Sequence, residues 1–286
     1  MKVLRGSTIL AALILAAAVQ QASAQQAAAK KLSTLLGTTG ACNNASPGGP
    51  CTKQSTLVEL DPQTGALIQT IGPVGFTVNG LAWSGGKLYA STAIGDVNFH
   101  GLITINHRTG AGKPVDPTAV NFGLAGADSP VHSITVDSRG RMVGWYDEFA
   151  VGVTDTFVQI DKRTGVATEF PNTGVDTANN GLSFSDFNIL WNIDTTRVNS
   201  SGATTQTAYM IDPANGKPLC SRLLSPPTPA ALGDFNPSND LYYGLNFDSS
   251  GPRPFPAIIE VVDLRTGTVT KLGRTVDDLH TLAFEK

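Results

Sequence analysis

The sequence predicts an all-β protein that folds as a five-bladed β-propeller. Three observations lead to this fold class: a strand-and-turn motif that occurs five times, a second strand motif in phase with the first, and a spacing of about fifty residues between copies. A unit of about fifty residues that holds four short strands is typical of one propeller blade. A six-bladed ring is the less favoured alternative, because the spacing provides no sixth unit.

The first motif is an alternating apolar run followed by Asp or Asn, two variable residues, and Thr-Gly or Asn-Gly. Its copies are "LVELDPQTG" (57–65), "LITINHRTG" (102–110), "FVQIDKRTG" (157–165), "AYMIDPANG" (208–216) and "IEVVDLRTG" (259–267). Alternating β-branched residues suit a half-buried strand, the Asp can bond backbone N–H groups of a turn, and the Gly takes the positive φ of a hairpin. We therefore interpret Asp61 and its equivalents as turn formers rather than catalytic carboxylates.

The second motif is an apolar strand rich in small residues, which in four of its five copies continues through a tight turn into a strand rich in aromatics. The copies are "NGLAWSGGKLYAS" (79–91), "HSITVDSRGRMVGWY" (132–146), "NGLSFSDFNILWNI" (180–193), "LGDFNPSNDLYYGL" (232–245) and "HTLAFEK" (280–286). Successive copies align on an aromatic residue or Val, at Trp83, Val136, Phe184, Phe235 and Phe284. With strands named A to D outward from the propeller axis, this motif supplies A and B, and the first motif supplies C and the turn into D.

The two ends of the chain complete one blade. Residues 280–286 supply only an A strand, whereas residues 31–39, 56–61 and 66–72 have the patterns of B, C and D. We therefore expect the ring to be closed by pairing of the N- and C-terminal strands, which also removes an exposed sheet edge.

The connections between strands differ in length. The A–B and C–D connections are tight, whereas the B–C connections are long, at residues 40–54, 93–100, 147–155, 195–206 and 248–256. In a propeller the B–C and D–A connections share one face. We expect this loop-rich face to carry the binding groups, because loops on a rigid scaffold are where such groups concentrate.

Residues 1–24 are typical of an export signal peptide. Lys2 and Arg5 precede the apolar run "ILAALILAAAV", and "ASA" at 22–24 offers a cleavage site. A membrane anchor is less favoured, because the run is shorter than the ~20 residues that a bilayer requires. We expect a secreted or periplasmic protein with residues 25–286 in a single propeller domain and no membrane insertion after signal removal.

The charge is mildly acidic, with 20 Lys and Arg against 23 Asp and Glu. Because no basic cluster follows Lys30 and Lys31, nucleic acid and anionic lipid are excluded as expected partners. We expect a monomer that binds a small molecule or a protein at the loop-rich face.

The three cysteines allow one disulfide bond. Cys42 and Cys51 bracket the loop "NNASPGG", and an oxidising compartment favours a bridge between them. Cys220 is then unpaired, and we expect it to be buried as a small apolar residue.

The residue four places before the aligned aromatic defines the candidate site. It falls at the start of each A strand, and its copies are Asn79, His132, Asn180, Ala231 and His280. Asn and His side chains can ligate a divalent metal ion such as calcium or zinc, or bond another ligand. The alternative is a polar rim without a ligand, in which Asn serves the turn.

Acidic residues lie just before three of these positions, and they are Asp128, Asp176, Asp277 and Asp278. They could orient the metal or ligand-binding side chains or act as a general base. The alternative is that they are solvated loop charges.

The stretches "NGLAWSGGKLYAST" and "NNGLSF" resemble the repeats of bacterial exported propellers, and more loosely those of gluconolactonase/regucalcin-type and NHL- or YVTN-type propellers. In the gluconolactonase type, the Asn of such an "NG" pair ligates a divalent metal, so this resemblance implies that role for Asn79. The chain differs from that family in its five predicted blades and in lacking a match for the family's N-terminal Glu ligand.

Residues 76–92 are similar in outline to the "FT.GL" and "GGKLY.ST" runs of plant-type glutaminyl cyclases, which are five-bladed propellers. Ala82 stands where that family has an acidic residue. Three functions follow as alternatives: a binding module that uses the loop-rich face and central channel, a metal-dependent hydrolase or lactonase, and a cyclase-like acyltransferase. The sequence contains no Gly-rich phosphate loop, HExxH or Gly-x-Ser-x-Gly motif.

Overall fold

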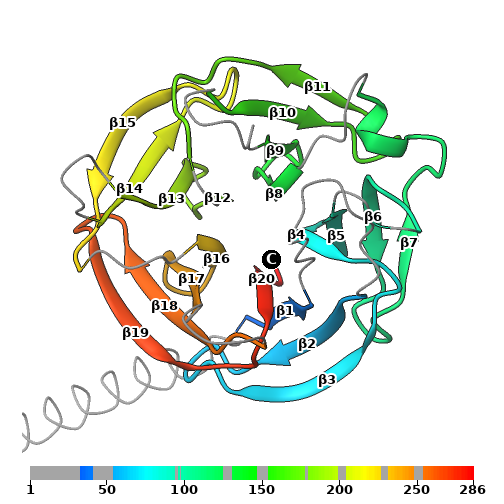
Figure 1. Ribbon diagram of the computed structural model, residues 1–286, viewed down its shortest axis with the longest axis horizontal. Coiled ribbons are helices and arrows are strands. Elements are labelled where there is room, and N and C mark those ends of the chain that lie inside the picture. Colours follow the sequence, from blue (N-terminus) through cyan, green and yellow to red (C-terminus); the bar gives the residue numbers. More distant parts are fainter. Residues whose placement is uncertain are drawn as a thin grey trace, which may run out of the picture. The chain divides into compact units, whose positions relative to one another are not determined.

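The structure is a computed structural model that describes residues 33–40, 54–93, 96, 98–124, 131–146, 154–177, 180–198, 204–226, 231–247 and 254–286. The predicted signal peptide and the Cys42–Cys51 pair lie outside these residues. Ser33–Lys286 is one compact unit. Its described strands form five four-stranded antiparallel sheets arranged around an axis, which confirms the five-bladed β-propeller (Figure 1). Within the described ranges, no helix has the length and apolar character needed to cross a bilayer.

Each blade runs outward from an inner strand. The first blade consists of β20 (Leu279–Phe284), β1 (Leu35–Thr39), β2 (Thr56–Leu60) and β3 (Leu67–Pro73). The second consists of β4 (Val78–Ser84), β5 (Lys87–Thr92), β6 (Leu102–Ile105) and β7 (Gly112–Pro114), followed by the short 3-10 helix η1 (Val120–Gly123). The third consists of β8 (Val131–Val136), β9 (Met142–Tyr146), β10 (Thr156–Ile160) and β11 (Ala167–Phe170). The fourth consists of β12 (Asn180–Phe184), β13 (Leu190–Val198), β14 (Thr204–Ile211) and β15 (Pro218–Leu223). The fifth consists of β16 (Ala231–Asn236), β17 (Leu241–Phe247), β18 (Ala257–Asp263) and β19 (Thr268–Arg274).

The first blade is assembled from both ends of the propeller. Strand β20 pairs antiparallel with β1, and the register sets Phe284 opposite Leu35. Figure 1 shows the red β20 beside the blue β1 at the centre of the ring. This confirms the predicted closure, and it gives both strands a partner on the side that would otherwise be an open edge.

The C–D turns have the chemistry that the repeat predicts. In all five, the Asp or Asn side chain accepts a hydrogen bond from the N–H two residues later: Asp61 from Gln63, Asn106 from Arg108, Asp161 from Arg163, Asp212 from Ala214 and Asp263 from Arg265, at 2.7–2.9 Å. The final glycines have φ between 71° and 82°. These residues are therefore turn formers, as predicted.

The hydrophobic core lies between neighbouring blades. At the interface of the third and fourth blades, Trp145 and Phe157 pack with Leu182 and Phe184. The other four interfaces each hold a similar apolar cluster. Because each blade is held by two neighbours, the inner strands have fixed positions around the axis.

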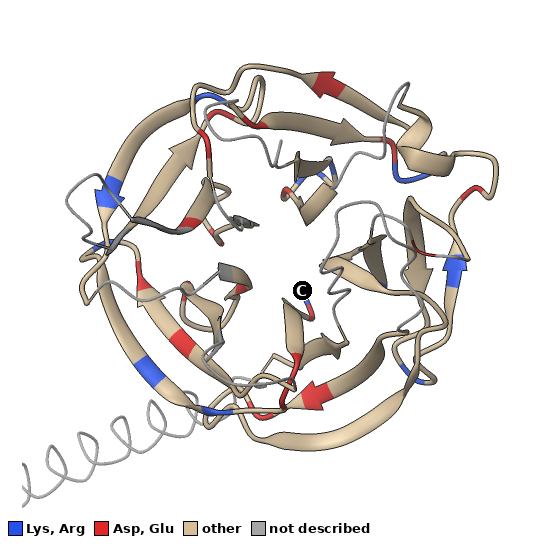
Figure 2. Cartoon of the chain, in the orientation of Figure 1, with Lys and Arg blue, Asp and Glu red and all other residues tan. Residues whose placement is uncertain are grey.

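The exposure of Cys220 differs from the prediction. Cys220 is exposed on the outermost strand β15, so the prediction that it is buried is wrong. The reason is that β15 is the outer edge strand of its blade, and all six of its residues are exposed. Figure 2 shows that Lys and Arg residues are interspersed with Asp and Glu residues along the described part of the propeller.

Candidate functional site at the start of the inner strands

The predicted site residues begin the five inner strands. We call Asn79, His132, Asn180, Ala231 and His280 the inner-strand layer; they lie at the start of β4, β8, β12, β16 and β20 respectively. Because the blades are antiparallel, this end carries the B–C and D–A connections. Each of the five B–C connections lies partly outside the described residues.

Three members of the layer are extra residues in β-bulges. In β4, Val78 pairs with Thr92 and Gly80 with Ser91, which leaves Asn79 without a partner residue in the ladder. His132 in β8 and His280 in β20 likewise have no partner residue in the ladder. A bulge turns a side chain away from the regular alternation of a strand, and bulges are over-represented beside functional sites.

His132 lies in an environment that keeps its side chain neutral. The residue is half-buried, and its Nε2 atom is inaccessible to solvent. Burial, and after it the positive charges that His280 and His100 can carry, lower the pKa of the His132 imidazole from 6.5 to about 4. The structure therefore places three histidines from the first three blades close enough to interact electrostatically.

His100 is a member of this group that the sequence analysis missed. It is 5% exposed, and its imidazole packs edge-on against Phe122 with ring centroids 5.9 Å apart. The repeat alignment does contain a pattern that points to His100, which stands two residues before the first motif of its blade. Ser55, Asp155 and Gln206 are at the same position in other blades, and all three are buried polar residues.

Asn79 is 7% exposed, and the chain before it is fixed by side chains of other segments. The N–H of Thr77 donates to the Asp96 carboxylate at 2.5 Å, and the N–H of Val78 donates to Ser55 Oγ at 2.9 Å. These bonds hold the start of β4 in place and so position Asn79.

Gly80, the second residue of the "NG" pair, is required by packing. A Cβ atom there would lie 2.9 Å from the His132 carbonyl oxygen and 3.1 Å from the Ile134 nitrogen. Only glycine lets β4 approach β8 this closely. In this Asn-Gly pair, Asn79 therefore supplies a buried amide, and Gly80 permits the close contact with β8, the strand that carries His132.

Asp277 and Asp278, two of the four predicted acidic residues, have polar contacts in the structure. Asp277 forms an ion pair with Arg274 at 3.0 Å. Asp278 accepts a hydrogen bond from the N–H of Phe255 at 3.0 Å, and its own φ is 57°. Asp176 is half-buried before β12. Asp128 lies outside the described residues, as does the side chain of Asn180.

A different carboxylate fixes the chain before Asn180. Asp155 is fully buried, and its Oδ2 atom accepts hydrogen bonds from Trp145 Nε1 at 3.0 Å, the Thr177 N–H at 2.8 Å and the Thr177 hydroxyl at 2.5 Å. Asp155 thereby ties the D–A connection of the third blade to its B and C strands.

The structure does not establish a metal centre. Among the residues that it describes, no three His, Cys, Asp or Glu side chains are grouped as metal ligands. The assignment of calcium or zinc to Asn79, His132, Asn180 and His280 stays a prediction.

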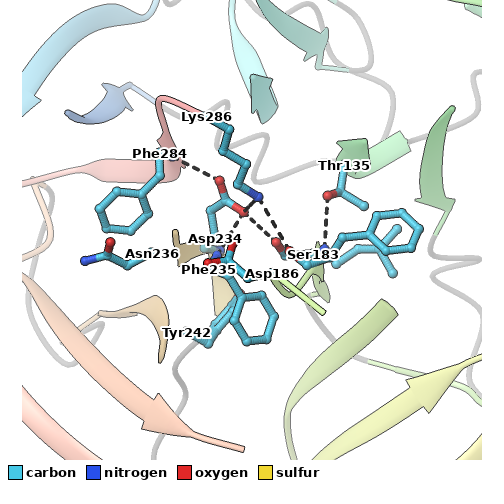
Figure 3. A network of polar contacts seen from close by, with 12 residues as sticks. Thr135, Ser183, Asp186, Asp234, Phe235, Asn236, Tyr242, Phe284 and Lys286 are labelled. Carbon is cyan, nitrogen blue, oxygen red and sulfur yellow. Dashed lines mark hydrogen bonds and ion pairs between the residues drawn. The ribbon is translucent and has the colours of Figure 1, made fainter. Parts of the chain in front are cut away.

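A second polar group lies farther along the inner strands (Figure 3). Asp234 in β16 accepts hydrogen bonds from the Ser183 hydroxyl at 2.5 Å and the Phe284 N–H at 3.0 Å, and forms an ion pair with Lys286 Nζ at 2.9 Å. Thr135 Oγ1 accepts a hydrogen bond from the Phe184 N–H at 3.2 Å. These contacts join the third, fourth, fifth and first blades at their innermost strands.

The sequence analysis did not single out this group, although its alignment contains the signal. The residue before each aligned aromatic is Ala82, Thr135, Ser183, Asp234 or Ala283. Three consecutive blades therefore have a hydroxyl or carboxyl group at one position of the innermost strand.

Comparison with known proteins places the fold. No family model and no curated protein sequence matches this chain. Similar solved structures include a GH43 β-1,3-galactosidase (TM-score 0.52, 12% identity, 73% of this chain and 48% of that chain) and an α-L-arabinofuranosidase of Clostridium thermocellum (0.51, 11%, 85% and 94%). An endo-1,4-β-xylanase of Bacteroides thetaiotaomicron is also similar (0.50, 9%, 85% and 94%).

This chain spans about half the length of the galactosidase chain. At these identities the likeness shows a shared propeller architecture. The resemblances to gluconolactonase-type, NHL- or YVTN-type and glutaminyl cyclase propellers stay predictions.

Proposed function

We propose that this propeller is a binding module that holds a small polar molecule at the inner-strand layer. The observation that carries the proposal is the electrostatic interaction of His132 with His280 and His100, which come from three different blades. Side chains brought together from separate blades on a rigid scaffold are the usual construction of a ligand site.

The protonation state favours an uncharged ligand. With a pKa of about 4, the His132 imidazole is neutral at pH 7 and offers one hydrogen-bond donor and one acceptor. The Asn79 amide adds a donor and an acceptor. Hydroxyl or amide groups, which both donate and accept, complement such a set.

The test follows the histidine ring signals by NMR at pH 7 while neutral monosaccharides and N-acetylated amino acid amides are added separately. We expect one of these probes to shift the His132 and His280 signals saturably, and His132→Ala or His280→Ala to abolish its binding. Arg139→Ala, an exposed substitution in the A–B turn of the same blade as His132, should leave affinity unchanged. Unshifted histidine signals with every probe, or equal affinity in the histidine variants, would contradict the proposal.

The metal-dependent hydrolase is the second candidate, because metal ligation requires neutral imidazole and His132 meets that requirement. Metal analysis of the purified protein and melting in the presence of chelator test it. Bound calcium or zinc that is lost in His132→Ala and His280→Ala supports this candidate. A metal-free protein whose melting temperature is unaltered by chelator would exclude it.

A further inference from the structure

A groove of about 410 Å³ lies between the first and second blades. Charged, polar and aromatic residues line it, among them Glu59, Gln69, Trp83, His107, Arg108 and Glu285. Trp83 is near the end of β4 and Glu285 follows β20, so the groove lies at the opposite end of the inner strands from Asn79 and His280. We call it the tight-turn groove, and it does not depend on the function proposed above.

Backbone contact between the two blades fixes one wall of the groove. Gly72 of β3 lies directly against the carbonyl of Thr109, and Gly110, with φ of 82°, lies against Gly72. The turn that carries His107 and Arg108 is thereby held on the first blade. The His107 ring also packs on Trp83, with centroids 5.2 Å apart and planes inclined by 59°.

Arg108 is the unusual member of its repeat. In the equivalent turns of the third and fifth blades, the arginine has an ion pair with the turn aspartate: Arg163 with Asp161 at 3.7 Å and Arg265 with Asp263 at 3.1 Å. In the second blade the turn residue is Asn106, so the turn offers Arg108 no carboxylate.

Glu59 and Glu285 bring negative charge to the same groove. Neither Arg108 nor Glu285 has a side-chain hydrogen bond or ion pair with any residue that the structure describes. Glu59 accepts one hydrogen bond, from Gln69 Nε2 at 2.6 Å. The groove thus holds one guanidinium and two carboxylates that do not neutralise one another by direct contact.

We propose that the tight-turn groove binds a dibasic amino acid, a small molecule with one carboxylate and two ammonium groups. Its carboxylate bonds the Arg108 guanidinium, for which a planar fork of donors is suited. Its two ammonium groups bond Glu59 and Glu285, and its methylene chain lies along Trp83 and His107. The ligand's charges are thus the complement of the three charges in the groove.

The probe is L-lysine, titrated at low salt while the indole N–H signal of Trp83 is followed by NMR and assigned with Trp83→Phe. We expect saturable binding with a dissociation constant of the order of 1 mM, because exposed ion pairs are individually weak. Added salt should weaken it through screening. Cadaverine, which has both ammonium groups and no carboxylate, should bind more weakly than lysine.

Three variants identify the contacts. Arg108→Ala should weaken lysine binding about threefold or more and leave cadaverine binding unchanged or stronger, whereas Arg163→Ala in the equivalent turn should have no effect. Glu285→Gln should weaken both probes. Asn106→Asp keeps every charge of the groove but supplies the missing turn carboxylate, so it should weaken lysine binding by competing for Arg108.

Two results would overturn the proposal. One is the absence of a saturable shift of the Trp83 signal with lysine at low salt. The other is equal lysine affinity in wild type and Arg108→Ala. Neither result affects the inner-strand layer, because His132 and His280 lie at the other end of their strands and are followed by separate signals.

Discussion

The neutral state of His132 makes the stability of the fold depend on pH. Its pKa is about 4 in the folded protein and 6.5 ordinarily, so the unfolded chain binds more protons between these values. The stabilisation is complete above pH 6.5 and is lost as the pH falls towards 4, by about 3 kcal/mol.

His132→Gln removes this titration, so its free energy of unfolding should fall less than that of the wild type between pH 7.5 and pH 4.5. Urea unfolding at several pH values measures both curves, and the comparison cancels the contribution of other groups. Parallel curves for the two proteins would show that His132 does not have a lowered pKa.

Single residues also show what could be predicted from sequence. The positions of Asn79, His132 and His280 followed from aligning the repeats, because the repeat fixes where an inner strand begins. His100 and Asp234 could not be paired with their neighbours in this way. His100 interacts electrostatically with His132, and Asp234 forms an ion pair with Lys286, only because neighbouring blades bring them together.

At the scale of structural elements, the D strand of one blade contacts the C–D turn of the next blade. This contact requires glycine in the D strand, because a Cβ atom would clash with the turn. Gly72→Ala would place a Cβ atom against the Thr109 carbonyl, and Gly273→Ala would place one 2.7 Å from the Thr64 carbonyl. We expect each substitution to destabilise the fold by about 1–3 kcal/mol, because neither backbone can move without shifting a blade.

Thermal or denaturant unfolding tests this expectation. Lys271→Ala is the control, since Lys271 is exposed in β19, and it should change stability by no more than about 0.5 kcal/mol. Wild-type stability in both glycine variants would mean that the blades can separate locally at no cost.

The elements that were predicted are those with local chemistry. The turn residues Asp61 and Gly65 determine a hairpin by themselves, so the C–D turns followed from the sequence. The bulges at Asn79, His132 and His280 could not be predicted in this way. A bulge depends on the register between two paired strands, and the sequence of one strand does not determine that register.

For the whole molecule, Asp234 in the fifth blade connects the fourth blade to β20, the inner strand of the first blade. It bonds Ser183 of the fourth blade and the backbone of β20 in the first, and its side chain is 8% exposed. Asp234→Asn removes the charge opposite Lys286, which is itself three-quarters buried. We expect a loss of about 2 kcal/mol, less than for a fully buried pair because Lys286 reaches solvent.

Denaturant unfolding of Asp234→Asn, Lys286→Met and the double variant gives the coupling energy of the pair. Asp263→Asn is the control, because its ion pair with Arg265 is exposed, and it should cost at most about 1 kcal/mol. Additive effects of Asp234→Asn and Lys286→Met would show that the ion pair does not contribute to stability.

The number of blades and the closure by the two ends were predictable because they follow from counting repeats and from the strand patterns that each end supplies. The tight-turn groove was not, since its walls come from β1, β2, β3 and β4, from the turn after β6 and from the chain after β20. Asn106 differs from its equivalents in the sequence, but the consequence for Arg108 requires the neighbouring blade.

The bulges at the start of the inner strands have a consequence for how this protein can change. Asn79, His132 and His280 have no partner residue in the ladder and belong to none of the apolar clusters between the blades, so neither the register nor those clusters depends on their side chains. The present chain already carries an amide at one such position and imidazoles at two. A library that randomises these three codons would therefore vary the recognition chemistry of the propeller at positions outside the ladder, and the fold provides a starting point for selecting new binding specificities.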